Sequence, residues 1–376
     1  MRIHYQSVLA SLVLLTLLNN TTFAQYKFTV IVQNEATPVK NQDQTGTCWS
    51  FATASFLESE LIRQGKGKHD LSEMFVVRKV YKEKAANYLA KKGKAVFSQG
   101  SLSHDLIDAI GQYGIVPETV YTGMQEGERW HDHSELEVSL KGLLDGLAKK
   151  ENVSYRWKQI YDTILDTYMG QAPEAFTYQG KTYTPQSFAK ELNIQTEDYI
   201  SITSFAHHDF YETFVLDLPD NFAGGYYYNL PLDEFQSAID HALQNGYTVS
   251  WDADVTEDGF CTYNGVAVIP ENPNAKHLFK KPIKEVTVTQ ELRQAQFESE
   301  ETTDDHLMHI TGMAKDQQGN TYYIVKNSWG EKSGKDGYMY VSAAYLRLKS
   351  ISVMMHKDAL PMMVSDKLSF NIQGRK

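Results

Sequence analysis

The spacing of apolar residues changes along the chain, and this change limits the folds that the chain can adopt. In the first third, apolar side chains recur about every 3.6 residues, which predicts helices over residues 48–65, 72–89 and 103–113. In the last third, short apolar runs between Gly and Asp clusters predict strands over residues 248–251, 308–313, 321–325 and 338–341. Early helices and late strands indicate an α+β fold in which two faces meet at a cleft.

The segment between these two parts has a different pattern. Residues 123–245 mix basic and acidic side chains on amphipathic helices, such as 135–149 and 153–168, with a hairpin near 176–184. We interpret this segment as a large, mainly helical insertion. The predicted domains are an N-terminal strand with a helical lobe, the insertion, a β lobe and a C-terminal tail, at residues 25–122, 123–245, 246–361 and 362–376.

The first 24 residues have the pattern of an export signal. Arg2 precedes an apolar run over residues 8–18, and a polar stretch then ends at Ala24. The run is shorter than the roughly 20 residues that a membrane helix needs. We therefore expect cleavage near Ala24 and a mature protein in the periplasm or outside the cell, and an uncleaved N-terminal anchor is the alternative.

The composition excludes several kinds of function. A net charge of −11 disfavours nucleic-acid binding, which requires a concentrated positive face. The two cysteines, Cys48 and Cys261, are too few for a disulfide framework or a four-thiolate zinc site, and we expect Cys261 to be a buried free thiol. Two histidine runs, at residues 131–133 and 207–209, lack a companion cysteine, and we interpret both as solvated surface. We expect no metal and no cofactor.

Cys48 lies where the first predicted helix begins. It comes six residues after Gln42 and directly after Thr47, the expected N-cap. Free backbone N–H groups and the helix dipole stabilise a thiolate at that position, and the thiolate is the nucleophilic form. A lone cysteine before an apolar helix is also typical of a buried structural residue, because a free thiol packs as a small hydrophobic group. The position of Cys48 is compatible with both interpretations.

Two later segments supply partners for a nucleophile. One predicted strand carries His306 and His309, and Asn327 follows the next predicted strand. A histidine base that is oriented by a third group is the recurring arrangement of nucleophilic catalysis. Because side chains on a strand alternate between its two faces, only one of the two histidines can reach Cys48.

Together, the segments around Cys48, His306 and Asn327 resemble the papain-like cysteine peptidases, and most closely the bleomycin hydrolase and aminopeptidase C branch. The resemblance rests on residues 39–42, 48–51, 71–73, 112–117, 302–306 and 327–338. It implies a papain-like two-lobed fold opened by the insertion, and thiol-dependent hydrolysis of peptide bonds in peptide substrates. It also implies a homo-oligomer, since that branch is described as forming a hexamer.

The resemblance implies a role for several residues of this chain. Cys48 would be the nucleophile, His306 the base and Asn327 the group that orients the base. Gln42 would form the oxyanion hole with the backbone N–H of Cys48. Trp329 would shield the hydrogen bond between His306 and Asn327, or it is part of the core. The candidate substrate contacts are Gly100, Ser101, Asp305 and Trp329.

The chain also departs from the family pattern. Thr45 stands where the common papain signature has a cysteine, which removes a disulfide near the start of the helix. His306 lies 258 residues after Cys48, against about 130–150 in the papain pattern, and the insertion accounts for the excess. The tail ends in Gly374-Arg375-Lys376, not in the small apolar terminus expected to dock along the cleft. We favour an aminopeptidase, and the alternatives are an endopeptidase and a catalytically idle binding protein.

Overall fold

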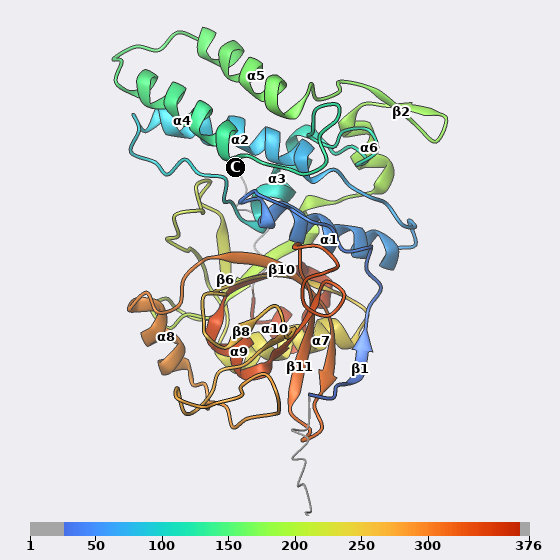
Figure 1. Ribbon diagram of the computed structural model, residues 1–376, viewed down its shortest axis with the longest axis vertical. Helices are drawn as coiled ribbons and strands as arrows, with labels where there is room; N and C mark the ends of the chain where they lie inside the picture. Colours follow the sequence, from blue (N-terminus) through green and yellow to red (C-terminus); the bar gives the residue numbers. More distant parts are fainter. Residues whose placement is uncertain (1–25, 369–376) are drawn as a thin grey trace, which may run out of the picture.

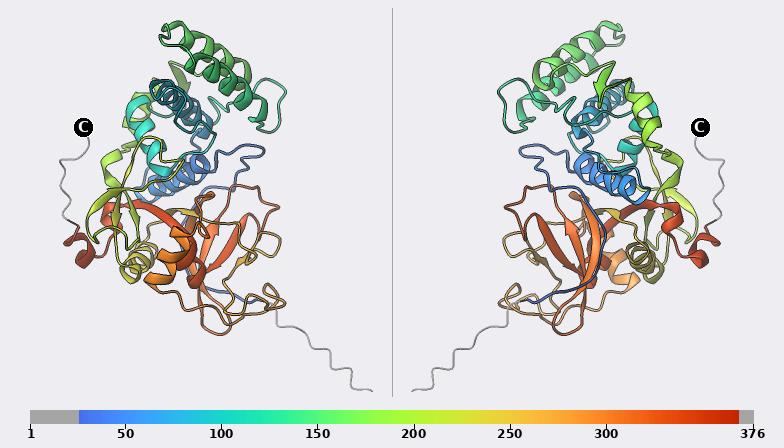
Figure 2. Two further views of the ribbon diagram at one scale, coloured as in Figure 1. Left: turned by 90° about the vertical axis from the view of Figure 1, so that its left-hand side faces the viewer. Right: turned by 90° about the vertical axis from the view of Figure 1, so that its right-hand side faces the viewer.

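The computed structural model describes residues 26–368 of the chain, which form two stacked lobes (Figures 1 and 2). Helices make up the lobe at the top of Figure 1, and a large sheet with short helices makes up the lobe below it. The predicted export signal and the last eight residues of the tail lie outside the described residues. Within residues 26–368, no helix combines the length and the apolar character that crossing a membrane requires.

The helical lobe consists of helices α1 to α6, a two-stranded hairpin and a short 3-10 helix. Their bounds are α1 Cys48–Arg63, α2 Glu73–Ala90, α3 Ser103–Tyr113, α4 Ser134–Ala148, α5 Arg156–Met169, β2 Phe176–Tyr178, β3 Lys181–Tyr183, α6 Pro185–Leu192 and η1 Thr196–Asp198. Ser72 caps α2 by accepting a hydrogen bond from the backbone N–H of Phe75 at 3.1 Å. Thr47 is the N-cap residue of α1, but its side chain makes no capping bond and instead lies 2.5 Å from the hydroxyl of Thr45.

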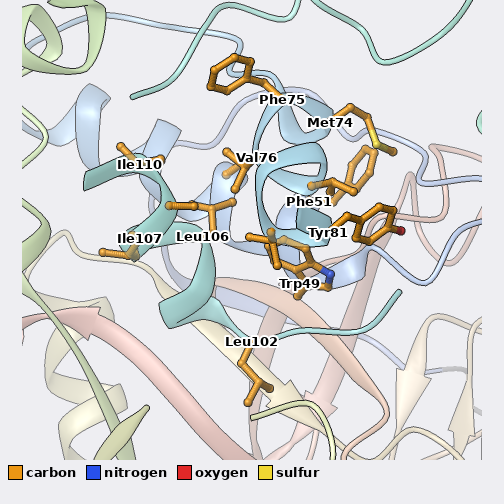
Figure 3. Packing of buried hydrophobic residues seen from close by; sticks show 14 of the residues in the cluster. Trp49, Phe51, Met74, Phe75, Val76, Tyr81, Leu102, Leu106, Ile107 and Ile110 are labelled. Atoms are coloured by element: carbon orange, nitrogen blue, oxygen red, sulfur yellow. The ribbon is translucent and has the colours of Figure 1, made fainter. Parts of the chain in front are cut away.

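The core of the helical lobe forms where α1, α2 and α3 pack together (Figure 3). Trp49 and Phe51 of α1 lie among apolar side chains from α2 and α3. Trp49 is fully buried, and its indole N–H donates to the carbonyl of Gln99 at 3.0 Å. Burial of a large apolar side chain contributes roughly 2–3 kcal/mol. The packing of Trp49 therefore fixes the first turn of α1, where Cys48 lies.

The β lobe is built on an 11-stranded sheet in the order β5-β6-β4-β13-β7-β10-β11-β12-β9-β8, with β1 paired to β10 outside this path. The strands are β1 Thr29–Gln33, β4 Tyr199–Thr203, β5 Thr213–Val215, β6 Tyr226–Asn229, β7 Val249–Ala253, β8 Phe260–Cys261, β9 Val266–Ala267, β10 His306–Lys315, β11 Thr321–Lys326, β12 Tyr338–Ser342 and β13 Ser350–His356. The helices of this lobe are α7 Leu232–Gln244, α8 Gln290–Glu298, α9 Ala343–Lys349, η2 Lys357–Ala359 and α10 Met362–Ser365.

The described part of the tail binds to the β lobe. Leu368 and Val364 are buried in its core. The ammonium of Lys367 lies 2.6 Å from the carboxylate of Glu234 on α7. Residues 362–368 are therefore anchored beside α7.

The insertion contains strands that the apolar pattern does not predict. Its first part is helical through α4, α5 and α6, as expected, and α7 ends it. Residues 199–229, however, form β4, β5 and β6, which extend the large sheet. Every residue of β4 is buried, so this strand lacks the alternation of apolar and polar residues by which a half-exposed strand is recognised.

We predict that Gly114→Ala destabilises the fold. Gly114 ends α3 with a φ of +78°, and an added Cβ would lie 2.1 Å from the backbone of Pro185 at the start of α6. Strain and overpacking at such a position cost about 1–3 kcal/mol. Thermal unfolding should show a lower midpoint for this variant. Gly142→Ala is the control, because Gly142 lies in α4 with open space around it, and it should be neutral or slightly stabilising; equal midpoints for the two variants would contradict the prediction.

Candidate active site

His306 and Asn327 meet where β10 and β11 diverge. β10 begins at His306, but its pairing with β11 begins at His309, and Asn327 directly follows β11. His306 Nε2 lies 2.8 Å from Asn327 Oδ1, which also accepts the backbone N–H of Ser328 at 2.7 Å. An amide oxygen only accepts hydrogen bonds, so Nε2 carries the proton of the neutral imidazole. Nδ1 therefore keeps a free lone pair and is the basic nitrogen of His306.

Trp329 covers the hydrogen bond between these two side chains. Its indole stacks on the imidazole of His306, with ring centroids 4.4 Å apart and 26° between the ring planes. Trp329 is half-buried, whereas His306 is 3% exposed. A hydrogen bond shielded from water is electrostatically stronger than an exposed one. The stacking therefore favours the shielding role of Trp329 over a place in the core.

Cys48 lies against the same end of β10. Its thiol accepts hydrogen bonds from the backbone N–H groups of Leu307 and Trp49. The N–H of Leu307 is available because residues 306–308 have no pairing partner on β11. Cys48 is a free cysteine and 9% exposed. The end of the strand ladder thus brings the thiol next to the residue that follows His306.

Burial controls the protonation of both groups. It raises the pKa of the Cys48 thiol to about 12 and lowers the pKa of His306 to about 4, against the opposing effect of the hydrogen bond to Asn327. Each shift penalises an isolated charge in a site from which water is largely excluded. Burial therefore opposes a charge on either group alone. Transfer of the thiol proton to His306 would create two adjacent opposite charges, which offset part of each other's desolvation.

Gln42 is held by the segment that follows Asn327. Its backbone N–H donates to the carbonyl of Ser328 at 2.8 Å, and the hydroxyl of Ser328 donates to Gln42 Oε1 at 2.6 Å. The side-chain nitrogen donates one of its two N–H groups to the carbonyl of Thr45 at 2.7 Å. Ser328 thus orients the amide of Gln42, a contact that sequence reasoning missed although Ser328 directly follows Asn327.

His309 lies on the other face of β10 and belongs to a different network. Its Nδ1 is 2.9 Å from Ser55 Oγ on α1, and Lys326 donates to the same hydroxyl at 2.7 Å. Because Lys326 donates to Ser55, the hydroxyl proton is directed at His309. Side chains therefore alternate along β10 as the sequence predicts, since His306 faces Asn327 instead.

A buried ionic cluster lies next to this network, behind α1. The ammonium of Lys40 is 2.7 Å from Glu73 and 3.6 Å from Glu58. Burial raises the pKa of Glu73 to about 7, and burial followed by the charge of Glu73 raises the pKa of Glu118 to about 8. Burial also lowers the pKa of Lys326 to about 8. The cluster anchors Lys40 and Lys326, which precede Gln42 and Asn327 in the chain.

The predicted substrate contacts lie in different surroundings. Asp220 is packed on Gly100, because a Cβ added there would lie 1.9 Å from Asp220 Oδ2. The hydroxyl of Ser101 donates to Asp105 at 2.6 Å, so this side chain belongs to the start of α3. Asp305 is exposed and accepts a backbone N–H from the loop after β7 at 3.2 Å. Ser101 and Asp305 thus have partners within the protein, and Gly100 lies against Asp220.

Asp252 and Asp304 were not anticipated from the sequence, yet their charges act on the thiol and raise the pKa of Cys48 further. Asp252 is the next-to-last residue of β7 and is 2% exposed, and Asp304 lies two residues before His306. The available signal was a carboxylate directly after the predicted strand 248–251, since an Asp is almost never fully buried unless it is paired.

One expectation about histidines was wrong. His131 and His133 are 8% and 3% exposed, because Gln44 pairs with the residue between them and draws this run against the loop before α1. The run at 207–209 is exposed, as expected.

Cys261 is free but half-buried. Within residues 26–368, no group of three or more His, Cys, Asp or Glu side chains is arranged to hold a metal ion.

Comparison with known proteins identifies the family. The pattern of the Peptidase C1-like family matches residues 94–374. The chain belongs to this family. The peptidase is 25% identical over 377 residues to an aminopeptidase C of Lactobacillus delbrueckii subsp. lactis, covering 89% of this chain and 82% of the relative. It is 23% identical over 391 residues to the bleomycin hydrolase of Mus musculus, covering 90% and 84%.

A solved structure supports the fold. PepW of Lactobacillus rhamnosis HN001 matches with a TM-score of 0.71 at 23% identity, covering 90% of this chain and 84% of that chain. The fold of this peptidase is papain-like, with the helical lobe, the β lobe and the insertion described above. Family and relatives together make it a cysteine-type peptidase of the bleomycin hydrolase and aminopeptidase C branch, and confirm the resemblance seen in the sequence.

We predict a pH-dependent effect of Glu118→Gln on stability. The folded-state pKa of Glu118, about 8, is above the unfolded value of about 4.3. The stability contributed by its neutral form is therefore complete below about pH 4 and is lost as the pH rises through 8. Glutamine stays neutral, so the variant should gain roughly 2 kcal/mol over the wild type between pH 5 and pH 8. Urea unfolding at both values measures this gain.

The control for this measurement is Glu126→Gln, because Glu126 is exposed. Its difference from the wild type should be the same at pH 5 and pH 8. A Glu118→Gln difference that stays constant or shrinks as the pH rises would show that the folded protein does not hold Glu118 neutral.

Proposed function

We propose that this protein is an aminopeptidase that cleaves peptide bonds through Cys48, His306 and Asn327. The observation that carries this proposal is the hydrogen bond from His306 Nε2 to Asn327 Oδ1 under the indole of Trp329. This hydrogen bond leaves Nδ1 as the basic nitrogen of His306. The thiol of Cys48 lies at the same end of β10. The aminopeptidase C relatives support the same activity.

In the first step, Nδ1 of His306 would take the thiol proton as the sulfur attacks the scissile carbonyl carbon. The Asn327 hydrogen bond stabilises the imidazolium that forms and keeps its orientation. The carbonyl oxygen becomes an oxyanion, which the second N–H of the Gln42 amide and the backbone N–H of Cys48 would stabilise. Preorganised donors of this kind contribute about 3 kcal/mol each.

In the second step, His306 would return the proton to the leaving amine, and the C–N bond breaks to leave a thioester on Cys48. A water molecule then adds to the thioester carbonyl, with His306 taking a proton from it. Collapse of this second oxyanion expels the Cys48 sulfur, which takes the proton back from His306, and releases the carboxylic acid, which loses its proton to water. One water is consumed for each peptide bond that is cleaved.

Two other functions remain as alternatives. An endopeptidase would use the same groups on an open cleft. A catalytically idle binding protein would have no need for a base, an orienting amide and a shielded thiol in one place. Export, signal cleavage near Ala24 and a homo-oligomer stay predictions from the sequence.

Substitutions at the site should separate catalysis from folding. Cys48→Ala removes the nucleophile and should abolish cleavage of an amino-acid reporter amide. Asn327→Ala should lower kcat roughly 100-fold, because the base is no longer held in its productive orientation. Gln42→Ala should lower kcat by about 10²–10³ through loss of an oxyanion donor.

Cys261→Ala is the matched control, since it removes the other free thiol at a distance in sequence from all four site residues, and it should keep full activity. An epoxide thiol-peptidase inhibitor should label the Cys48 peptide in the wild type and in this control. Activity that survives Cys48→Ala in a folded variant would refute the proposed mechanism.

The exopeptidase character is tested with one reporter in two forms. An aminopeptidase should cleave the amino-acid reporter with a free α-amine and fail on its N-acetylated form, because the amine is part of what is recognised. We expect kcat/KM to fall at least tenfold on acetylation, a difference of about 1.4 kcal/mol. Equal or faster cleavage of the acetylated form would favour the endopeptidase.

A further inference from the structure

Asp252 points from the sheet toward the helical lobe. Its neighbours Trp251 and Ala253 belong to the core of the β lobe, so the alternation of β7 directs Asp252 to the opposite face. Ser250 lies on that opposite face too, and its hydroxyl is 2.9 Å from that of Ser103 on α3. Asp252 is 2% exposed. A carboxylate is therefore buried between the two lobes.

Asp304 faces Asp252 across this space. The two carboxyl groups hydrogen bond to each other, which requires a proton on one of them. No N–H or hydroxyl group within residues 26–368 donates to Asp252 Oδ1 or Asp304 Oδ2. Burial raises the pKa of Asp304 to about 7 and that of Asp252 well above its usual range. A pair in this state is completed either by a shared proton or by a cation.

Asp220 adds a third carboxylate from the loop of residues 216–225. It rests on the backbone of Gly100, and the hydroxyl of Ser98 donates to its Oδ1 at 3.2 Å. Asn221 closes the loop by donating to two backbone carbonyls at 2.8 and 3.1 Å. The charge of Asp220 acts on both buried carboxyl groups. The loop therefore presents Asp220 to them in a fixed position.

The carboxyl groups of Asp252, Asp304 and Asp220 make the region beside the Cys48 thiol negatively charged. Lys84 is a buried cation whose charge acts on Asp304 and Asp220, but its ammonium donates to the carbonyl of Gly100 and lies 3.4 Å from the hydroxyl of Ser98. Leu307, whose N–H bonds to the Cys48 thiol, pairs directly with Asp252 across the strands. The charges of Asp220, Asp105, Glu137 and Asp304 all act on this one ammonium, so it does not balance the carboxyl groups beside the nucleophile.

We propose that Asp252, Asp304 and Asp220 form a subsite beside Cys48 that binds a protonated amine of the substrate. An ammonium would donate hydrogen bonds to the unpartnered oxygens and replace the shared proton. The α-ammonium of a peptide lies two bonds from the first carbonyl carbon, and the side-chain ammonium of a lysine near the cleavage point is a second source. The proposal deepens the proposed function, since it names what the peptidase recognises.

The first test follows the thiol itself and needs no peptide cleavage. We compare the rates at which a cationic reagent, aminoethyl methanethiosulfonate, and a neutral one, methyl methanethiosulfonate, modify Cys48, measured by mass spectrometry of its peptide. The cationic-to-neutral ratio should fall at least tenfold in the double variant Asp252→Asn with Asp304→Asn, and also in Asp220→Asn. It should not change in Asp258→Asn, which removes an exposed carboxylate of the same lobe. A ratio that stays at the wild-type value in folded variants overturns the subsite.

A measurement on the wild type alone guards against a variant that fails to fold. Butylammonium should slow the modification of Cys48 by the neutral reagent, whereas butanol at the same concentration should not. Equal effects of the two compounds overturn the proposal.

The second test identifies the source of the amine. The substrates are alanine reporter amide with a free α-amine, and two N-acetylated dipeptide reporters that carry lysine or norleucine before alanine. If the α-ammonium is bound, the carboxylate variants lose at least tenfold in kcat/KM on the free-amine substrate only. If a side chain is bound, the loss appears on the lysine substrate only. Equal losses on all three substrates overturn a cation subsite.

The two tests separate failure of the proposal from failure of the proposed function. A wild type that cleaves none of the substrates would refute the aminopeptidase, and the reagent ratio at Cys48 would still decide whether the carboxylates attract a cation.

Discussion

The register of β10 is the constraint on which the site depends. The strand pairs with β7 from its first residue but with β11 only from His309 onward, so three residues at its start have a free edge. That edge supplies the N–H of Leu307 to the thiol and lets Asn327 leave β11 toward the imidazole. Because a shift of one residue would turn every side chain of β10 to the other face, the register decides at once which histidine meets Asn327 and which carboxylates meet Cys48.

The buried polar network behind α1 stabilises this register at an energetic cost. Lys326 pairs with His309 across the strands and reaches Ser55 of α1, so the helix that carries Cys48 is tied to the strand pair that carries the base. A buried ion is costly to desolvate unless its partners are well placed, and here Lys40 has Glu73 within 2.7 Å. Such a network tolerates few alternative arrangements and therefore fixes the relative position of the two lobes.

Much of the fold and of the active site could be predicted from the sequence. The features that could not be predicted depend on contacts between distant segments. The helix at Cys48, the strand at His306 and the asparagine segment are each encoded by local pattern, and the family resemblance joins them. Nothing local indicates that Asp220, from the insertion, rests on Gly100, since that contact depends on how β5 and β6 extend the sheet. The burial of His131 also depends on a contact between distant segments. The loop at Gln44 packs on the polar segment that contains His131 and buries it.

The two groups of buried carboxylates in this protein differ in how completely they are paired, and the difference bears on function. Behind α1, Glu58 and Glu73 both lie within 4 Å of the ammonium of Lys40, so each has a cation of the chain as a direct partner. Beside Cys48, the hydroxyl of Ser352 donates to Asp252 Oδ2 at 3.4 Å, but Asp252 Oδ1 and Asp304 Oδ2 have no donor within residues 26–368. An unbalanced pair destabilises the folded state, and burial alone does not explain why it lies next to the nucleophile. A substrate that brings its own positive charge would supply the missing partner at the moment when the thiol must react.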